Sequence, residues 1–144
     1  MQLTGSCFCS AVEWEAEVDT NRIGLCHCRD CQIISGGAFR MSSAVDPKKF
    51  RFSKGSPREF EKTADSGSVR RMVFCGECGT HLCSMPADAV EEGAFVSIRL
   101  ATSPDFSKLN PIAELFCDSR VPWLPDIDGT WKFPRMPAIP PPDE

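Results

Sequence analysis

The sequence predicts a single, mainly β domain built from short antiparallel strands. Several short segments alternate between apolar and polar side chains, which is the period of a strand with one buried face. Helical patterns are brief, and neither a repeat nor a linker divides the 144 residues. A chain of this length can bury a core of its own, so one domain accounts for the whole sequence.

The clearest predicted strand covers residues 12–18, where Val12, Trp14, Ala16 and Val18 alternate with glutamates. Segments 50–52 and 60–62 predict a hairpin around residues 54–57, because Gly55 and Pro57 are typical turn residues. Further strands are expected at residues 68–74, 82–85, 95–100 and 112–116.

Two short helical turns are predicted, at residues 29–34 and 88–92. Gly36 and Gly37 end the first of them. The chain becomes rich in proline after Arg120, and its last residues are also acidic. We therefore expect a domain of residues 1–136, followed by an extended Pro-rich acidic tail of residues 137–144.

The overall charge argues against several classes of partner. The formal net charge is −4 and the isoelectric point is about 5.2, so no basic surface indicates a nucleic-acid partner. The sequence shows no secretory signal and no stretch of transmembrane length, which predicts a cytoplasmic protein without a membrane partner. Thiols stay reduced in that compartment, and nine cysteines are an odd number, so metal binding is favoured over disulfides.

Seven of the nine cysteines form three groups along the chain. The groups are Cys7 with Cys9, then Cys26, Cys28 and Cys31, and finally Cys75 with Cys78. A structural zinc site has four protein ligands, whereas a catalytic zinc keeps three and leaves one position open. Seven thiols therefore divide into one closed zinc site and one open zinc site, which predicts two ions.

The closed site is predicted from the two cysteine pairs. Cys75 and Cys78 are three residues apart and are followed by Gly79, the pattern of a zinc knuckle in which the glycine takes a positive φ. Cys7 and Cys9 are two residues apart, so their thiols project from one face if the segment is extended. Together the four thiols predict a tetrahedral zinc site that ties the N-terminal strand to the middle of the domain.

The open site is predicted from the triplet. Three thiolates from one turn leave a coordination position that can bind a substrate thiol or polarise a carbonyl. We interpret His27 as a hydrogen-bonding neighbour or a surface residue rather than a ligand, and His81 as structural. The alternative is a second structural site completed by Cys83 or Cys117, although burial in a strand is the expected fate of Cys83.

The loop after the triplet has its own possible role. Gly36 and Gly37 allow a ligand to approach the backbone, and Arg40 can meet a carboxylate. The alternative interpretation is a loop that only ends a short helix.

These motifs resemble the glutathione-dependent formaldehyde-activating enzymes, whose domain also occurs in centromere protein V. The resemblance covers residues 3–136 and rests on segments 5–9, 26–31, 36–39, 74–80 and 119–123, with Asp128 and Gly129 beyond them. It implies a β-tent fold, a structural zinc on Cys7, Cys9, Cys75 and Cys78, and a catalytic zinc on Cys26, Cys28 and Cys31. It also implies carbon–sulfur lyase activity, whose prototype joins glutathione and formaldehyde into S-hydroxymethylglutathione. Cys83 and Cys117 depart from the family pattern.

We therefore predict a zinc-dependent carbon–sulfur lyase that acts on the adduct of a small carbonyl compound with a small-molecule thiol such as glutathione. The expected pocket walls are Gly36, Gly37, Phe39, Arg40, Arg120 and Trp123. Two other interpretations remain. One is an enzyme like the B-type methionine sulfoxide reductases, with Cys117 as its nucleophile. The other is a zinc-stabilised binding module without catalysis.

Overall fold

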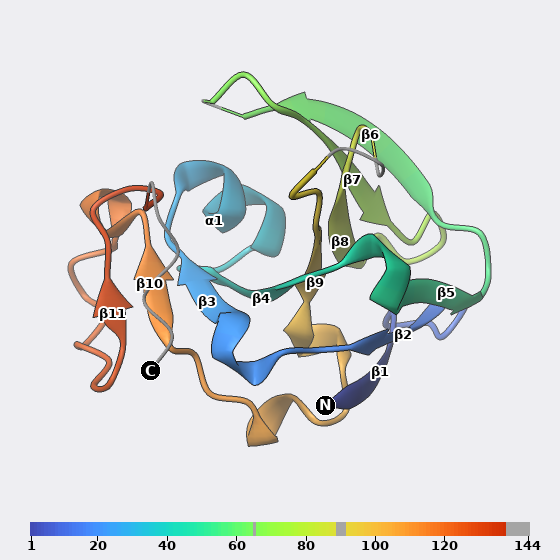
Figure 1. The fold of residues 1–144 in the computed structure, drawn as a ribbon, viewed down its shortest axis with the longest axis horizontal. Helices are drawn as coiled ribbons and strands as arrows, with labels where there is room; N and C mark the ends of the chain where they lie inside the picture. The colour runs from blue at the N-terminus through green and yellow to red at the C-terminus, as the bar shows by residue number, and fades with distance from the viewer. Residues whose placement is uncertain (65, 89–91, 138–144) are drawn as a thin grey trace.

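The computed structural model describes residues 1–64, 66–88 and 92–137, and it arranges the strands of these ranges in two sheets (Figure 1). The smaller sheet has the order β1-β2-β5, and the larger has the order β11-β10-β3-β4-β9-β8-β7-β6. The strands are β1 Gln2–Ser6, β2 Glu13–Glu17, β3 Ile23–Cys26, β4 Arg40–Val45, β5 Phe50–Lys54, β6 Arg58–Thr63, β7 Val69–Phe74, β8 His81–Pro86, β9 Val96–Arg99, β10 Ala113–Leu115 and β11 Trp131–Lys132. The prediction of a mainly β fold is confirmed.

Helical structure is brief within the described ranges. The α-helix α1 spans Arg29–Ser35, and Gly36 ends it in the left-handed conformation with φ of 68°. This confirms the helix expected at residues 29–34. The remaining helices are short 3-10 turns at Thr20–Arg22, Pro47–Lys49, Leu100–Thr102, Phe106–Lys108 and Cys117–Ser119. None of the described helices is long and apolar enough to cross a membrane.

The smaller sheet supplies the centre of the hydrophobic core. The alternation predicted for residues 12–18 is confirmed, because Trp14 and its apolar neighbours on one face of β2 are buried. The Trp14 ring packs against Phe50 of β5, with 6.2 Å between the ring centroids. Its indole N–H donates a hydrogen bond of 2.9 Å to the hydroxyl of Thr102, so the one polar atom of this buried ring is satisfied.

The larger sheet has two chemically different faces. Strand pairing aligns Val73, Cys83 and Ile98 across β7, β8 and β9. These side chains belong to the buried apolar cluster that also contains Trp14 and Leu3 of the smaller sheet. The opposite face is polar, because the same register puts Cys26, Arg40, Ser84, Ser97, Arg99 and Arg70 on it. In Figure 1, α1 lies on the side of β3 and β4 away from β1 and β2.

The predicted hairpin of residues 50–52 and 60–62 is wrong. β5 pairs with β2 of the smaller sheet, whereas β6 pairs with β7 of the larger one. The turn residues therefore carry the chain from one sheet to the other. Gly55 has a φ of 82° at this crossing, and a Cβ atom there would overlap the carbonyl oxygen of Ala11. The apolar side chain of Phe50 selects β2 as the partner, because it packs against Trp14.

The other expected strands are present with small changes at their ends. All four residues of β9 are buried, including Ser97 and Arg99, so both faces of this alternating segment are covered. β10 pairs in parallel with β3 and β11, which makes one edge of the sheet parallel. Residues 89–91 of the second expected helical turn and residues 138–144 of the expected tail lie outside the described part of the chain.

We expect Gly5→Ala to lower the free energy of unfolding by about 2 kcal/mol or more, because a Cβ atom at Gly5 overlaps the Trp14 ring and overpacking is costly. Gly24→Ala is the matched control. Gly24 is also a strand glycine, and its nearest neighbour to an added Cβ is the carbonyl oxygen of Ala113 at 3.6 Å. Urea denaturation of both variants tests this, and an equal effect would contradict it.

Candidate metal centres

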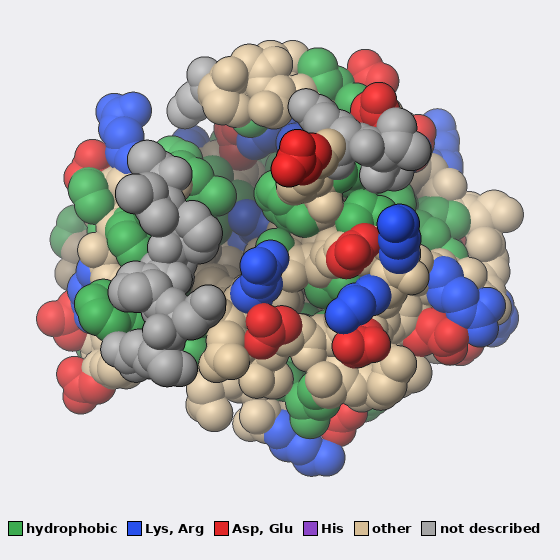
Figure 2. Space-filling model, viewed as in Figure 1, with side chains coloured by type: hydrophobic (Ala, Val, Ile, Leu, Met, Phe, Trp, Pro, Cys, Tyr) green, Lys and Arg blue, Asp and Glu red, His purple; other side chains and the backbone are tan. Residues whose placement is uncertain are grey.

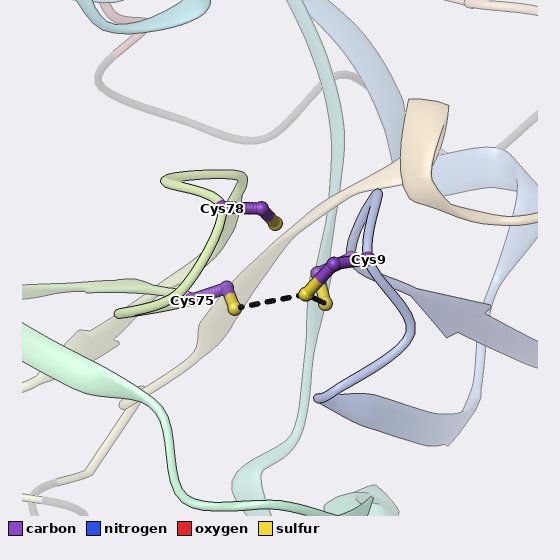
Figure 3. Close-up of side chains that lie close together, drawn as sticks. Cys9, Cys75 and Cys78 are labelled. Carbon is purple, nitrogen blue, oxygen red and sulfur yellow. Dashed lines mark hydrogen bonds between the residues drawn. The ribbon is translucent and has the colours of Figure 1, made fainter.

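Four cysteines from two distant turns meet where the two sheets approach each other. Cys7 and Cys9 lie in the turn after β1, and Cys75 and Cys78 lie in the turn between β7 and β8. The four sulfur atoms all lie within 4.8 Å of one another. Figure 3 shows Cys9 facing Cys75 and Cys78 across the gap between these turns.

The sulfur spacing fits a tetrahedral zinc ion. The Cys7 and Cys9 sulfurs are 3.7 Å apart, and the Cys9 and Cys75 sulfurs are 3.8 Å apart. Zinc–sulfur bonds of about 2.3 Å in a tetrahedron place the sulfurs about 3.8 Å from one another. Four thiols are also a donor set that structural zinc prefers. These residues can therefore hold such an ion.

Backbone groups shape both turns around their sulfurs. The N–H of Val12 donates to the Cys7 sulfur at 3.3 Å, and the N–H of Glu77 donates to the Cys75 sulfur at 3.4 Å. Gly79 has a φ of 78°, as the knuckle pattern predicts. The Cys7–Cys9 segment is not extended, because the N–H of Ser10 bonds to the carbonyl oxygen of Cys7 and Ser10 adopts a φ of 65°. This turn brings both thiols to the same side.

Thr80 connects the two turns, a role that the sequence analysis did not assign to it. Its hydroxyl accepts a hydrogen bond of 3.1 Å from the N–H of Phe8 and lies 3.1 Å from the Cys78 sulfur. Hydrogen bonds from the hydroxyl and backbone of Thr80 lower the pKa of Cys78 to about 5. A lowered pKa favours the thiolate, which is the form that binds metal.

The triplet forms a second cluster where β3 meets α1. Cys26 ends β3, Cys28 is the N-cap of α1, and Cys31 lies in the first turn of the helix. Their sulfurs lie within 4.8 Å of one another, and the N–H of Cys31 donates to the Cys28 sulfur at 3.4 Å. Cys26 and Cys31 are buried, whereas Cys28 is partly accessible. The cluster is therefore open on the side of Cys28.

Neither of the two remaining cysteines completes the triplet. Among the described residues, no fourth cysteine, histidine or carboxylate lies within ligand distance of these three sulfurs. Cys83 is fully buried on the apolar face of the larger sheet, which is the face opposite to Cys26. The Cys117 thiol donates instead to the carbonyl oxygen of Glu114, at 3.6 Å.

Positive charge lies beside the triplet. Arg40 is paired directly with Cys26 across β4 and β3, and its side chain is half-buried. Hydrogen bonds from Cys26 and Cys28 lower the pKa of Cys31, and the charges of Arg40 and Arg99 lower it further against the opposing effect of burial. The cluster therefore favours a thiolate at Cys31, as a metal ligand requires.

His27 is an internal residue that fixes the triplet segment. It is fully buried, and its Nε2 donates a hydrogen bond of 2.9 Å to Oε1 of Glu114 on β10. The interpretation of His27 as a hydrogen-bonding neighbour is confirmed, and the surface alternative is wrong. Phe39 packs edge-to-face on its ring, with 5.7 Å between the centroids. Because His27 lies between Cys26 and Cys28, these contacts fix the backbone that carries both thiols.

Glu114 is the buried charge at the centre of this network. Thr130 donates a hydrogen bond of 2.6 Å to its Oε2, Arg120 lies 3.4 Å from Oε1, and Lys132 lies 3.5 Å from Oε2. Burial raises the pKa of Glu114, but hydrogen bonds from Thr130, His27 and Arg120 outweigh burial and lower it below its usual range. Glu114 is therefore ionised at neutral pH.

The expected pocket residues separate into two groups. Arg40 lies beside the triplet, Phe39 packs on His27, and Gly36 and Gly37 are exposed beyond α1. Arg120 donates hydrogen bonds to the carbonyl oxygens of Leu124 and Pro125 in addition to its contact with Glu114, so its described contacts are within the protein. The Trp123 side chain is 72% exposed.

Comparisons with known proteins identify the family. The family model for the glutathione-dependent formaldehyde-activating enzyme matches residues 2–119. The chain belongs to this family. The match includes the four-cysteine cluster and the triplet, and it ends before Thr130 and Lys132 of the Glu114 network.

Two individual relatives give narrower information. The chain is 30% identical over 80 residues to an uncharacterized lyase of Schizosaccharomyces pombe, and this alignment covers 54% of the chain and 53% of the relative. The chain thus spans about half the length of this relative. A crystal structure of a Rhodobacter sphaeroides protein matches 69% of the chain and 86% of its own length, with a TM-score of 0.54 and 18% identity. This second likeness concerns the fold alone.

We expect Glu114→Gln to lower the free energy of unfolding by about 3 kcal/mol at pH 7, because it removes one partner from a buried ionic network. Glu17→Gln is the matched control, since Glu17 forms an exposed ion pair with Lys49 that is worth about 1 kcal/mol or less. Chemical denaturation of the two variants and the wild type checks the difference. Equal destabilisation by the two substitutions would show that the buried network contributes no more than a surface pair.

Proposed function

We propose that this chain is a zinc-dependent carbon–sulfur lyase that acts on the adduct of a thiol, such as glutathione, with a small carbonyl compound such as formaldehyde. Membership of the family and the lyase-named relative support a glutathione-related function of the lyase type. The observation that carries the proposal is the triplet, in which three clustered thiols have no fourth described ligand. A metal held this way keeps one position for substrate.

The two cysteine clusters have different roles in this proposal. The closed cluster holds a structural zinc, because its four thiols complete the coordination. This zinc links the two sheets of a β-tent fold through Cys7, Cys9, Cys75 and Cys78. Cys26, Cys28 and Cys31 hold the catalytic zinc. Burial of Cys26 and Cys31 leaves the side of Cys28 for the approach of substrate.

A zinc ion bound by the triplet supplies a Lewis-acidic position that stabilises a thiolate. In adduct formation the thiol loses its proton, the sulfur bonds to the carbonyl carbon, and the carbonyl oxygen takes a proton to become a hydroxyl. The reverse reaction breaks that carbon–sulfur bond. Arg40 supports the anionic sulfur electrostatically from its position opposite Cys26. Glu114 and Phe39 hold His27, and thereby the ligand backbone, in place.

The geometry does not favour Cys117 as a nucleophile. A reactive thiol needs a lowered pKa and an electropositive setting. Burial and the nearby charge of Glu114 instead raise the pKa of Cys117. The half-buried thiol is also engaged with the carbonyl oxygen of Glu114. These observations support the triplet over Cys117 as the reactive centre.

Cys28→Ser is expected to reduce the zinc content from two ions per chain to one and to abolish glutathione binding, while the circular dichroism spectrum is retained. The reason is that Cys28 belongs to the open cluster, which does not join the sheets. Cys75→Ser, in the closed cluster, should instead remove much of the folding stability, since a structural zinc contributes on the order of 10 kcal/mol. Metal analysis measures the zinc content of both variants, and calorimetry measures their glutathione binding and folding stability. A wild-type chain that holds a single tight zinc would contradict the proposal.

Cys117→Ser is expected to leave turnover of the glutathione–formaldehyde adduct within about twofold of the wild type, because the thiol only bonds to the backbone. The measurement is the rate of adduct formation and breakdown, followed by exchange spectroscopy and compared with the spontaneous rate. If Cys117→Ser lost its activity and the wild type reduced methionine sulfoxide, the chemistry would be assigned to Cys117 instead.

A further inference from the structure

Three arginines gather on the polar face of the larger sheet, next to the triplet. Arg40 donates a hydrogen bond of 2.7 Å to the hydroxyl of Ser97 on β9. Arg99 also reaches Ser97, with 3.3 Å to its carbonyl oxygen and 3.4 Å to its hydroxyl. Arg70 donates to the hydroxyl of Ser84, at 2.9 Å, and Ser84 is paired with Ser97 across β8 and β9. The three guanidinium groups thus surround two neighbouring serines.

These arginines lack the carboxylate partners that buried charges normally have. Within the described part of the chain, no aspartate or glutamate forms an ion pair with any of the three. Arg99 is only 7% exposed, and Nε of Arg40 is buried without a described hydrogen-bond partner. A buried charge that is neither paired nor fully hydrogen-bonded is costly. The face therefore has unused capacity to bind an anion.

The electrostatic surroundings lead to the same conclusion. Burial and the like charge of Arg40 together lower the pKa of Arg99 to about 9. Burial and the charge of Arg40 also lower the pKa of Arg70. The groups that oppose this effect are thiols, namely Cys31 and Cys26 beside Arg40, with Cys83 in addition near Arg99. Three thiolates and one divalent ion carry a single net negative charge, which compensates only one of the three guanidinium charges.

The arginine cluster is also placed for a ligand that reaches the triplet. Arg40 is opposite Cys26, and Arg99 lies one diagonal step further across the sheet. Lys62 on β6 forms an ion pair with Asp30 of α1, so the sheet curves around this face until its last strand contacts the helix. Figure 2 shows a hollow between α1 and the strands β7 and β9, with Lys or Arg side chains inside it.

We propose that Arg40, Arg70 and Arg99 form the binding site for a carboxylate of the substrate, so that the preferred substrates are thiols that carry a carboxylate close to the sulfur. The inference rests on the proposed function, since it assumes that the sulfur occupies the open position at the triplet. Guanidinium groups match a carboxylate through paired N–H donors. Ser84 and Ser97 hold the arginines in place. Arg40 is the member of this site that lies beside the triplet, opposite Cys26.

The test uses calorimetry on the zinc-loaded protein to compare two small thiols, N-acetylcysteine and N-acetylcysteine amide. They differ only in the charge of the carboxylate, which the amide lacks. We expect the acid to bind about ten to a hundred times more tightly than the amide, the range for hydrogen bonds to a charged group. Arg99→Gln should reduce this preference to less than about threefold. Arg71→Gln should keep it, because Arg71 lies on the other face of β7 and pairs with Glu59.

Zinc content and circular dichroism verify each variant. If Arg99→Gln loses zinc or structure, Arg70→Gln decides the question, since Arg70 is less deeply buried. Equal affinity of wild type for the acid and the amide, or a preference that survives both Arg99→Gln and Arg70→Gln, overturns the carboxylate site and leaves the thiol-binding triplet intact.

N-acetylalanine, which has the carboxylate but no thiol, separates this inference from the proposed function. If it binds in an Arg99-dependent way while the thiol amide does not bind, the anion site stands and the proposed function fails. If none of the three compounds binds, both are overturned.

Discussion

The two sheets meet at one end around four cysteines, and the rest of the structure is arranged about this junction. Cys7 and Cys9 follow the first strand of the smaller sheet, while Cys75 and Cys78 connect two strands of the larger sheet. Thr80 reinforces the junction through its hydrogen bond with the backbone of Phe8. With the sheets arranged in this way, Trp14 and its neighbours bury the apolar face of the larger sheet, and that face is unavailable for chemistry.

The polar face of the same sheet is consequently the place where function can develop. Cys26 and Arg40 are direct partners in the strand ladder, so the cysteine triplet and the arginine cluster lie on the same surface of the sheet. The helix α1 then adds Cys28 and Cys31 from its first turn. The triplet cysteines and the neighbouring arginines are thus carried by strands and by the start of a helix, and sites on such elements are positioned more precisely than sites on loops.

The parts that sequence reasoning predicted are those with a local signature. The alternation around Trp14, the glycine that ends α1, and the spacing of the seven cysteines all depend on neighbours in the chain. The pairing of β5 with β2 was missed because a Gly- and Pro-containing turn looks the same whether it closes a hairpin or crosses between sheets. Ser97 and Arg99 are the polar positions of an alternating segment, and only the tertiary arrangement shows that they are buried as well.

The Glu114 network has a consequence for where this fold ends. Among the described residues, four side chains contact the Glu114 carboxylate, and three of them, Arg120, Thr130 and Lys132, follow residue 119, the last residue matched by the family model. A protein truncated at that boundary would contain both cysteine clusters and yet leave a buried anion with His27 as its remaining partner. The segment matched by the family model therefore ends before the segment that completes this buried network.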